Sequence, residues 1–213
     1  MMKVKICGIQ TSDDAKAAVQ FGAHAIGFVF AESKRRVSPA VVRTIVEELP
    51  DTCMKVGVFV NEHPLMVREI AAFCHLTVIQ LHGDEYTSDY ESIGLPIIRS
   101  IPVMEGESVD LNRYGKADYY LLDTGGGKAR GGMGIPFDWE RVRGIGQGAD
   151  RIILAGGLNQ ANVNQATKIV KPYMIDVSSG VEMDGVKNPE MIKNFMNEVI
   201  GRRECNEITS RND

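Results

Sequence analysis

Eight short apolar runs recur along this chain of 213 residues, and helix-like stretches lie between them. The runs, each predicted to be a strand, cover residues 4–7, 25–30, 54–60, 78–82, 97–101, 119–123, 152–155 and 174–177. Several are apolar on consecutive residues, which is typical of parallel strands buried on both faces. Eight strands alternating with helices in this length predict a single-domain (β/α)8 TIM barrel. A doubly wound open sheet is the structural alternative, although no G-x-G-x-x-G motif follows the first strand.

The stretches between the runs carry helix signals at several places. Predicted helices cover residues 12–21, 39–49, 64–73, 84–92, 138–143, 159–170 and 189–200, with a short or irregular one near 109–114. Ser12 begins the first, and Pro39 occupies a first-turn position where its missing N–H costs nothing. The barrel is therefore predicted to span residues 1–201, and the polar segment 202–213 is expected to be a frayed tail.

Composition excludes several classes of protein. The net charge is −4, and neither a basic patch nor an arginine-rich arm points to nucleic acid. The apolar runs are far shorter than a membrane span, and the start of the chain lacks a signal-peptide pattern. Four widely spaced cysteines form no C-x-x-C pair, so free thiols in a cytoplasmic protein are expected. We predict neither a metal site nor a bound cofactor, and no membrane or nucleic-acid partner.

Two strand ends carry side chains that can move protons. In a parallel barrel, the carboxyl ends of all strands open on one face, where the chemistry of this fold takes place. Cys7 ends the first strand and can serve as a base or nucleophile, although most free cysteines are small buried hydrophobes. Asp123 ends the sixth strand, where a dry environment would raise its pKa and suit it to act as a general acid. Its structural alternative is a hydrogen bond to the loop that follows.

Small residues end the seventh and eighth strands, at Gly156-Gly157 and Ser178-Ser179-Gly180. Such residues let backbone N–H groups approach an anion closely, and these two loops form a frequent phosphate site in barrels. Tight turns are the alternative explanation, but the placement of both loops favours phosphate binding at Gly156, Gly157, Ser179 and Gly180.

A basic loop after the second strand carries Arg35 and Arg36. These are either solvated charges, or one of them pairs bidentately with a substrate carboxylate. His82 and Asp176, at the ends of the fourth and eighth strands, are supporting candidates; a structural histidine and a loop-orienting carboxylate are their alternatives. One base, one acid and two anion sites suit proton transfer on a phosphorylated acid.

The chain resembles the phosphoribosylanthranilate isomerase family along almost its whole length. The resemblance rests on VKICGI at 4–9, GFVF at 27–30, SKRRVSP at 33–39, VGVFVN at 56–61, QLHG at 80–83, LLD at 121–123, FDW at 137–139, AGGLN at 155–159 and DVSSGVE at 176–182. It implies a (β/α)8 enzyme of tryptophan biosynthesis that catalyses the Amadori rearrangement of a phosphosugar-anthranilate substrate.

Carried over residue by residue, the resemblance implies that Cys7 is the general base and Asp123 the general acid. Arg35 would face the anthranilate carboxylate, and Gly157, Ser179 and Gly180 fall in the phosphate loops. The chain departs from the family at Met133 and Ile135, where a hydroxyl and a basic residue are expected. It departs again at Arg36, where an aromatic residue is expected, which leaves Arg35 and Arg36 both open for the carboxylate.

Two other functions compete with this interpretation. Another phosphosugar-barrel enzyme, such as an epimerase or an isomerase of histidine biosynthesis, is one; a paired-aspartate isomerase would carry Asp in place of Cys7. A non-catalytic barrel that senses a phosphorylated ligand is the other, and it would not need both Cys7 and Asp123. Either a monomer or a homodimer is compatible with the sequence.

Overall fold

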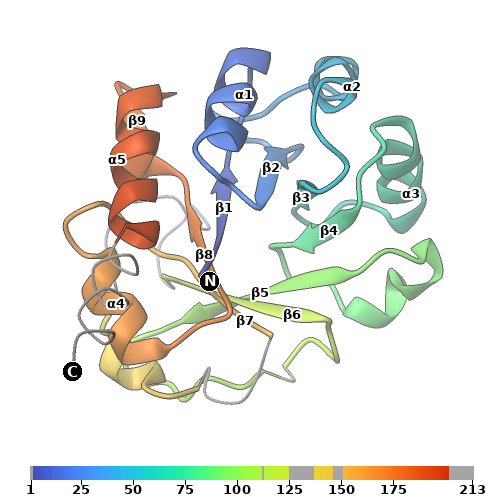
Figure 1. Ribbon diagram of the computed structural model, residues 1–213. Helices are drawn as coiled ribbons and strands as arrows, with labels where there is room; N and C mark the ends of the chain where they lie inside the picture. The colour runs from blue at the N-terminus through green and yellow to red at the C-terminus, as the bar shows by residue number, and fades with distance from the viewer. Residues whose placement is uncertain (1, 112, 125–136, 146–150, 202–213) are drawn as a thin grey trace, which may run out of the picture.

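Eight parallel strands close into a barrel in the computed structural model, which describes residues 2–111, 113–124, 137–145 and 151–201. The strands are β1 (Lys3–Cys7), β2 (Ala25–Val29), β3 (Met54–Phe59), β4 (Val78–Leu81), β5 (Ile97–Val103), β6 (Tyr119–Thr124), β7 (Ile152–Leu154) and β8 (Met174–Val177). Helices surround this barrel on the outside (Figure 1). The predicted (β/α)8 barrel is confirmed, and the open sheet is excluded because β1 pairs with both β2 and β8.

Five α-helices cover the barrel within the described residues. They are α1 (Ser12–Gln20), α2 (Pro39–Glu47), α3 (Pro64–Phe73), α4 (Val163–Val170) and α5 (Pro189–Ile200). Side-chain caps fix the starts of α1, α2, α3 and α5. In α2, Ser38 accepts from the Val41 amide, and a proline follows this cap, as predicted. For α1 the cap is Thr11, which accepts from the Asp14 amide, so the cap lies one residue before the predicted start.

The predicted helix over 84–92 is wrong, because this segment forms two 3₁₀ turns, Thr87–Asp89 and Glu91–Ile93. A tertiary hydrogen bond uses a backbone group that a helix would need: the Thr87 amide donates to the Tyr114 carbonyl at 3.0 Å. The Glu85 carboxylate accepts from the amide of nearby Gly83 at 2.7 Å. The segment therefore serves the loops at the barrel mouth and covers this side without an α-helix.

Three other boundaries differ from the prediction. The segment 138–143 is a 3₁₀ turn, Trp139–Val142, and the described residues of 109–114 form no helix. Helix α4 begins at Val163 and not at 159, because Asn159 and Asn162 use their amides in a turn: the Asn159 N–H donates to the Asn162 side chain at 2.8 Å. An unpredicted hairpin, β9 (Glu182–Met183) and β10 (Val186–Lys187), follows β8. The predicted tail 202–213 lies outside the described residues.

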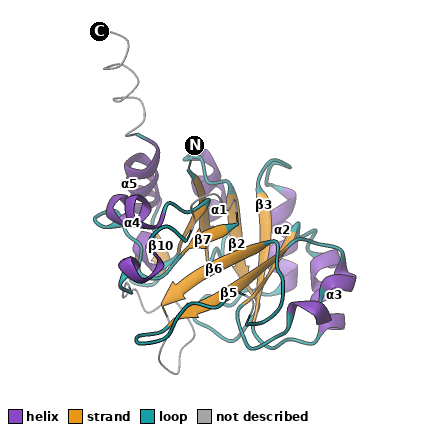
Figure 2. Ribbon diagram, turned by 90° about the horizontal axis from the view of Figure 1, so that it is seen from below, coloured by secondary structure: helices purple, strands orange, loops and turns teal. Residues whose placement is uncertain are grey.

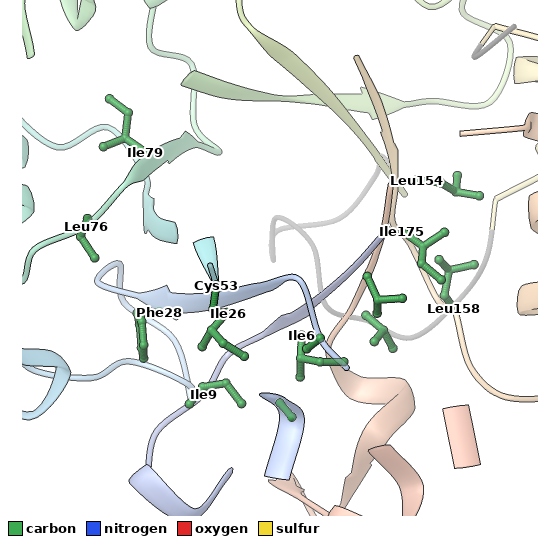
Figure 3. Packing of buried hydrophobic residues seen from close by; sticks show 14 of the residues in the cluster. Ile6, Ile9, Ile26, Phe28, Cys53, Leu76, Ile79, Leu154, Leu158 and Ile175 are labelled. Carbon is green, nitrogen blue, oxygen red and sulfur yellow. The ribbon is translucent and has the colours of Figure 1, made fainter. Parts of the chain in front are cut away.

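Two layers of apolar side chains make the core. The larger lies between the strands and the outer helices and includes Ile6, Ile26 and Ile175, seen together in Figure 3. The smaller fills the inside of the barrel with Ala25, Val56, Val78, Ile98, Leu121, Ile153, Ala155 and Met174. Strands β5 and β6 run side by side (Figure 2), and no α-helix among the described residues connects them. The strand ends above the inner apolar layer are left for polar side chains.

Candidate active site

Cys7 lies at the end of β1, on the inner face of the barrel. Val4 and Ile6 pack into the outer core, so the alternate residues Lys5 and Cys7 share the opposite face. Gly27 of β2 pairs with Cys7, and a Cβ at position 27 would lie 2.7 Å from the Cys7 Sγ and 3.1 Å from the Lys5 Cε. Glycine at 27 therefore leaves the space in which the thiol and the lysine side chain meet.

Burial raises the pKa of the Cys7 thiol, and Lys5 partly opposes this effect because it lies beside the sulfur. Lys5 is fully buried and donates to the Asp176 carboxylate of β8 at 3.0 Å. Burial alone would lower the pKa of Lys5, but the negative charges of Asp176 and Cys7 raise it overall. Lys5 was not among the predicted site residues, although the alternation along β1 places it on the same face as Cys7.

Asp123 lies inside the mouth, at the end of β6. Its Oδ1 accepts from the Thr124 amide at 2.8 Å, and its Oδ2 lies 3.5 Å from the His82 Nε2. Burial raises the pKa of Asp123 to about 6, with Asp176 contributing in the same direction and the Thr124 amide opposing it. A carboxyl group with this pKa keeps part of its population protonated near neutral pH, which is what a general acid needs.

His82 follows β4 and supports Asp123. Its Nδ1 lies 2.8 Å from the Ser100 hydroxyl and 3.2 Å from the Gln80 amide nitrogen. Burial, with a contribution from Lys5, lowers the pKa of His82 to about 4, so the imidazole is neutral at pH 7. The Nδ1 atom thus lies between two polar side chains, and Nε2 faces Asp123.

Arg35 lies against the turn that follows Cys7. Gly8 has φ +78°, and a Cβ there would lie 2.5 Å from the Arg35 Cδ, so the arginine needs glycine at this turn. The Arg35 Nε and Nη2 donate to Glu182 of β9 at 2.6 and 2.9 Å. Arg35 is buried, whereas Arg36 is exposed and its backbone bridges to Val29. Of the two arginines, Arg35 is therefore the one placed at the mouth.

Glu182 binds two cationic side chains, Arg35 and Lys187. It was not among the site residues predicted from the sequence. Its Oε1 also accepts from the Lys187 Nζ at 2.5 Å, and Lys187 donates to the Ser178 carbonyl at 3.1 Å. Although burial opposes this effect, hydrogen bonds from Arg35 and Lys187 lower the pKa of Glu182 to about 2. The Ser178 hydroxyl donates to the Cys7 carbonyl at 2.9 Å, which ties this cluster to the end of β1.

The two predicted phosphate loops lie next to each other. A Cβ at Gly180, in the 3₁₀ turn Ser179–Val181, would collide with the carbonyl oxygen of Leu158, so the loops after β7 and β8 touch. Gly157 has φ +64°. Gly156 has φ +80°, and a Cβ there would lie 2.6 Å from the Thr124 Oγ1 and 3.2 Å from the Asp123 Oδ1. Gly156 therefore gives room to the carboxyl group, a relationship that the sequence did not reveal.

Within the described ranges, no group of three or more His, Cys, Asp or Glu side chains is arranged to hold a metal ion. Over the same residues, no helix has the length and apolar character needed to cross a bilayer. The departures at Met133 and Ile135 lie outside the residues that the structure describes.

Comparison with known proteins identifies a family for this fold and site. Residues 4–198 match the sequence model of the family described as N-(5'phosphoribosyl)anthranilate (PRA) isomerase. A relative from Bacillus cereus (strain Q1), named N-(5'-phosphoribosyl)anthranilate isomerase, is 43% identical over 205 residues, which cover 96% of this chain and 99% of the relative.

Solved structures agree with the sequence match. The phosphoribosyl anthranilate isomerase of Thermus thermophilus is 33% identical, with a TM-score of 0.84 over 95% of this chain and 100% of that one. Another phosphoribosyl anthranilate isomerase was solved with reduced 1-(o-carboxyphenylamino)-1-deoxyribulose 5-phosphate, and it is 36% identical, with a TM-score of 0.77 over 94% and 100%.

The chain is thus an isomerase built on a (β/α)8 barrel, with its polar groups at the carboxyl ends of the strands. It belongs to the N-(5'-phosphoribosyl)anthranilate isomerase family, whose activity is a step of tryptophan biosynthesis.

Proposed function

We propose that Cys7 and Asp123 are the general base and the general acid of the Amadori rearrangement in this isomerase. The substrate is N-(5-phospho-β-D-ribosyl)anthranilate, and the product is 1-(2-carboxyphenylamino)-1-deoxyribulose 5-phosphate. The observation that carries the proposal is the environment of Asp123: a buried carboxyl group whose pKa rises to about 6, at the same barrel mouth as the Cys7 thiol. Asp176 acts electrostatically on both groups, which supports their proximity.

The first step opens the ribose ring. Protonated Asp123 gives its proton to the ring oxygen while the bond from this oxygen to C1 breaks. The anilino nitrogen supplies its electron pair to C1, and an iminium ion forms. The neutral His82 imidazole faces the Asp123 carboxylate that remains, with its Nε2 3.5 Å from Oδ2.

The second step removes a proton from C2. The Cys7 thiolate takes this proton, and the electron pair left on C2 moves toward the iminium nitrogen to give a neutral enolamine. The enolamine then becomes a ketone as C1 gains a proton and the C2 hydroxyl loses one. These reaction steps conserve atoms and electrons without an external oxidant. General acid and base steps each contribute about 10²–10⁴-fold to a rate.

Two anion sites hold the ends of the substrate in this proposal. Arg35 binds the anthranilate carboxylate: Glu182 accepts from two of its five N–H groups, which leaves others for a second carboxylate. The loops with Gly156, Gly157, Ser179 and Gly180 take the phosphate, because they adjoin each other and offer backbone N–H groups without side-chain bulk.

The test is turnover of the purified protein, followed as the loss of substrate fluorescence. Cys7→Ala and Asp123→Asn should fold normally and lose about 10²-fold or more in kcat. Cys53→Ala is the matched control, because Cys53 is also a buried thiol but packs in the outer core. Near-normal turnover in either site variant contradicts its proposed role. Assaying the related histidine-biosynthesis substrate in parallel tests the alternative of a second sugar substrate.

In this proposal, residues 1–201 form the catalytic domain. The protein functions in the cytoplasm as a monomer or a homodimer. Light scattering on the protein as it elutes from a size-exclusion column measures the oligomeric state. A variant truncated after residue 201 should retain turnover, and loss of turnover in a folded truncation would assign 202–213 to the active domain.

A further inference from the structure

Lys5 is a fully buried ammonium group at the edge of the apolar layer that fills the barrel. Its ion pair with Asp176 closes at 3.0 Å, with the Asp176 side chain 10% exposed. Removing an ammonium group from water costs several kcal/mol, and a well-packed apolar pair of similar volume usually serves stability equally well. Stability alone therefore gives no reason for a charge pair here, and the surroundings of Lys5 suggest a different use.

Those surroundings place the ammonium beside the Cys7 sulfur. Lys5 and Cys7 are alternate residues of β1 on one face, and the charge of Lys5 acts directly on the Cys7 thiol. Both side chains crowd the same point, since a Cβ at Gly27 would touch the Sγ and the Lys5 Cε alike. On the other side, β8 holds Asp176 opposite Lys5 in the strand register.

We propose that Lys5 is a positioning residue for the isomerisation: its ammonium group stabilises the thiolate form of Cys7, and Asp176 holds the ammonium charged and in place. The inference rests on the proposed role of Cys7 as the base. It assigns a function to an ion pair that neither binds the phosphate nor faces the carboxylate site. The ammonium itself transfers no proton to the substrate.

Other charges around the sulfur do not substitute for Lys5. Lys187, from the hairpin, also favours the thiolate, but it is already hydrogen-bonded to Glu182. Arg35 passes the same turn, and two of its N–H groups donate to Glu182. Asp176 disfavours the thiolate, so it helps Cys7 only through Lys5. Of these three cations, Lys5 has the largest electrostatic effect on the thiol and lies on the strand that carries it.

The pKa values of the two catalytic groups make this contribution necessary. Burial raises the pKa of the Cys7 thiol, whereas Asp123 titrates near 6, so the catalytic pair of thiolate and protonated acid is a minor state. Each further unit in the pKa of the thiol reduces this state about tenfold. Without Lys5, the rate in the plateau of the pH profile should fall, and its alkaline limb should move to higher pH.

The experiment measures the pKa of Cys7 directly, through the pH dependence of its alkylation by iodoacetamide, read at the Cys7 peptide by mass spectrometry. The alkylation rate follows the thiolate fraction. In Lys5→Met, which keeps the side-chain length, the pKa should rise by about one unit or more. The kcat at pH 7 should fall about tenfold or more, with KM changed less than about threefold.

Two further variants make the result decisive. Lys3→Met removes the same charge from the same strand, where Lys3 contacts Tyr173, and it should leave the pKa of Cys7 and kcat unchanged. Lys5→Met/Asp176→Asn removes the whole ion pair, so it keeps the protein folded if the lone Asp176 carboxylate destabilises the single variant. Its Cys7 pKa should lie between those of the wild type and Lys5→Met, because Asp176 itself disfavours the thiolate.

An unchanged Cys7 pKa in the folded Lys5 variants overturns the inference. So does an equal shift in Lys3→Met, which would trace the effect to the general charge of the strand. The alkylation readout needs no turnover, so it stands apart from the catalytic proposal. If Cys7→Ala is active while Lys5→Met still raises the pKa of Cys7, the proposed base is wrong and the electrostatic link remains.

Discussion

Arg35 and Glu182 form a bidentate ion pair across the mouth of the barrel, with Nε–Oε1 and Nη2–Oε2 distances of 2.6 and 2.9 Å. The pair joins the loop after β2 to the hairpin after β8, two segments far apart in sequence. A planar guanidinium held along one edge has a fixed direction for its remaining N–H groups. Glu182 therefore sets the direction of the Arg35 N–H groups that we propose for the substrate carboxylate.

Glu182→Gln should weaken substrate binding by about tenfold in KM while kcat falls less, because the amide holds Arg35 with fewer charge-assisted hydrogen bonds. Steady-state kinetics with the anthranilate substrate measures this split. Glu190→Gln, at the start of α5, removes a charge from the outside of the barrel and should have no effect. A normal KM in Glu182→Gln would show that Arg35 needs no such anchor.

Gly27→Ala should reduce turnover about tenfold or more while the protein still folds, since the added methyl group would lie 2.7 Å from the Cys7 Sγ. Overpacking of this kind costs about 1–3 kcal/mol and displaces the crowded side chains. Turnover together with the urea midpoint of unfolding measures both effects. Gly94→Ala, where a Cβ meets no atom within 4 Å but φ is +77°, is the control for a purely conformational cost. Equal turnover in the two variants would contradict the steric explanation.

The barrel itself could be predicted from sequence because its signal is local and repeated. Consecutive apolar residues in runs such as 25–30 indicate buried parallel strands, and all eight strands were found within a residue or two of their ends. Helices 64–73 and 189–200 were placed correctly, since each begins at a proline after a capping side chain. Segment 84–92 was wrongly predicted to be a helix. Its Thr87 amide donates instead to the carbonyl of Tyr114, which lies 27 residues further along the chain.

The site could be predicted only where a strand end by itself identifies a residue. Cys7 and Asp123 are such residues, and their positions at the mouth follow from the strand count. Lys5 and Glu182 were missed, because their importance comes from partners about 170 and 147 positions away in the sequence, Asp176 and Arg35. The relation of Gly156 to Asp123 is likewise a contact between strands, which no local pattern encodes.

Phosphate binding at the loops after β7 and β8 should be separable from carboxylate binding. Gly157→Asn should raise KM and the inhibition constant of inorganic phosphate by about tenfold or more, because a side chain obstructs the approach to the backbone N–H groups. Asparagine is chosen over valine because φ at 157 is +64°, a conformation that asparagine tolerates. Arg35→Ala should raise KM and leave phosphate inhibition unchanged. Unaltered phosphate inhibition in Gly157→Asn would place the phosphate elsewhere.

The raised pKa of Asp123 predicts that this acid costs the protein stability. Its pKa is about 6 in the folded state against an ordinary value of 3.8, so the folded state binds more protons between these values. The free energy of unfolding therefore falls as pH rises through this window, by about 3 kcal/mol at most from this group.

Asp123→Asn keeps the oxygen that accepts from the Thr124 amide and removes the buried charge. It should be about 1–3 kcal/mol more stable than the wild type at pH 7, and this gain should largely vanish at pH 4, where folded Asp123 is already protonated. Urea unfolding at the two pH values measures both quantities. Glu182→Gln should show the opposite sign at pH 7, because the pKa of Glu182 is lowered to about 2 and its ionised form stabilises the fold. A less stable Asp123→Asn at pH 7 would mean that the carboxylate is a structural group, held by its hydrogen bonds rather than kept for its proton.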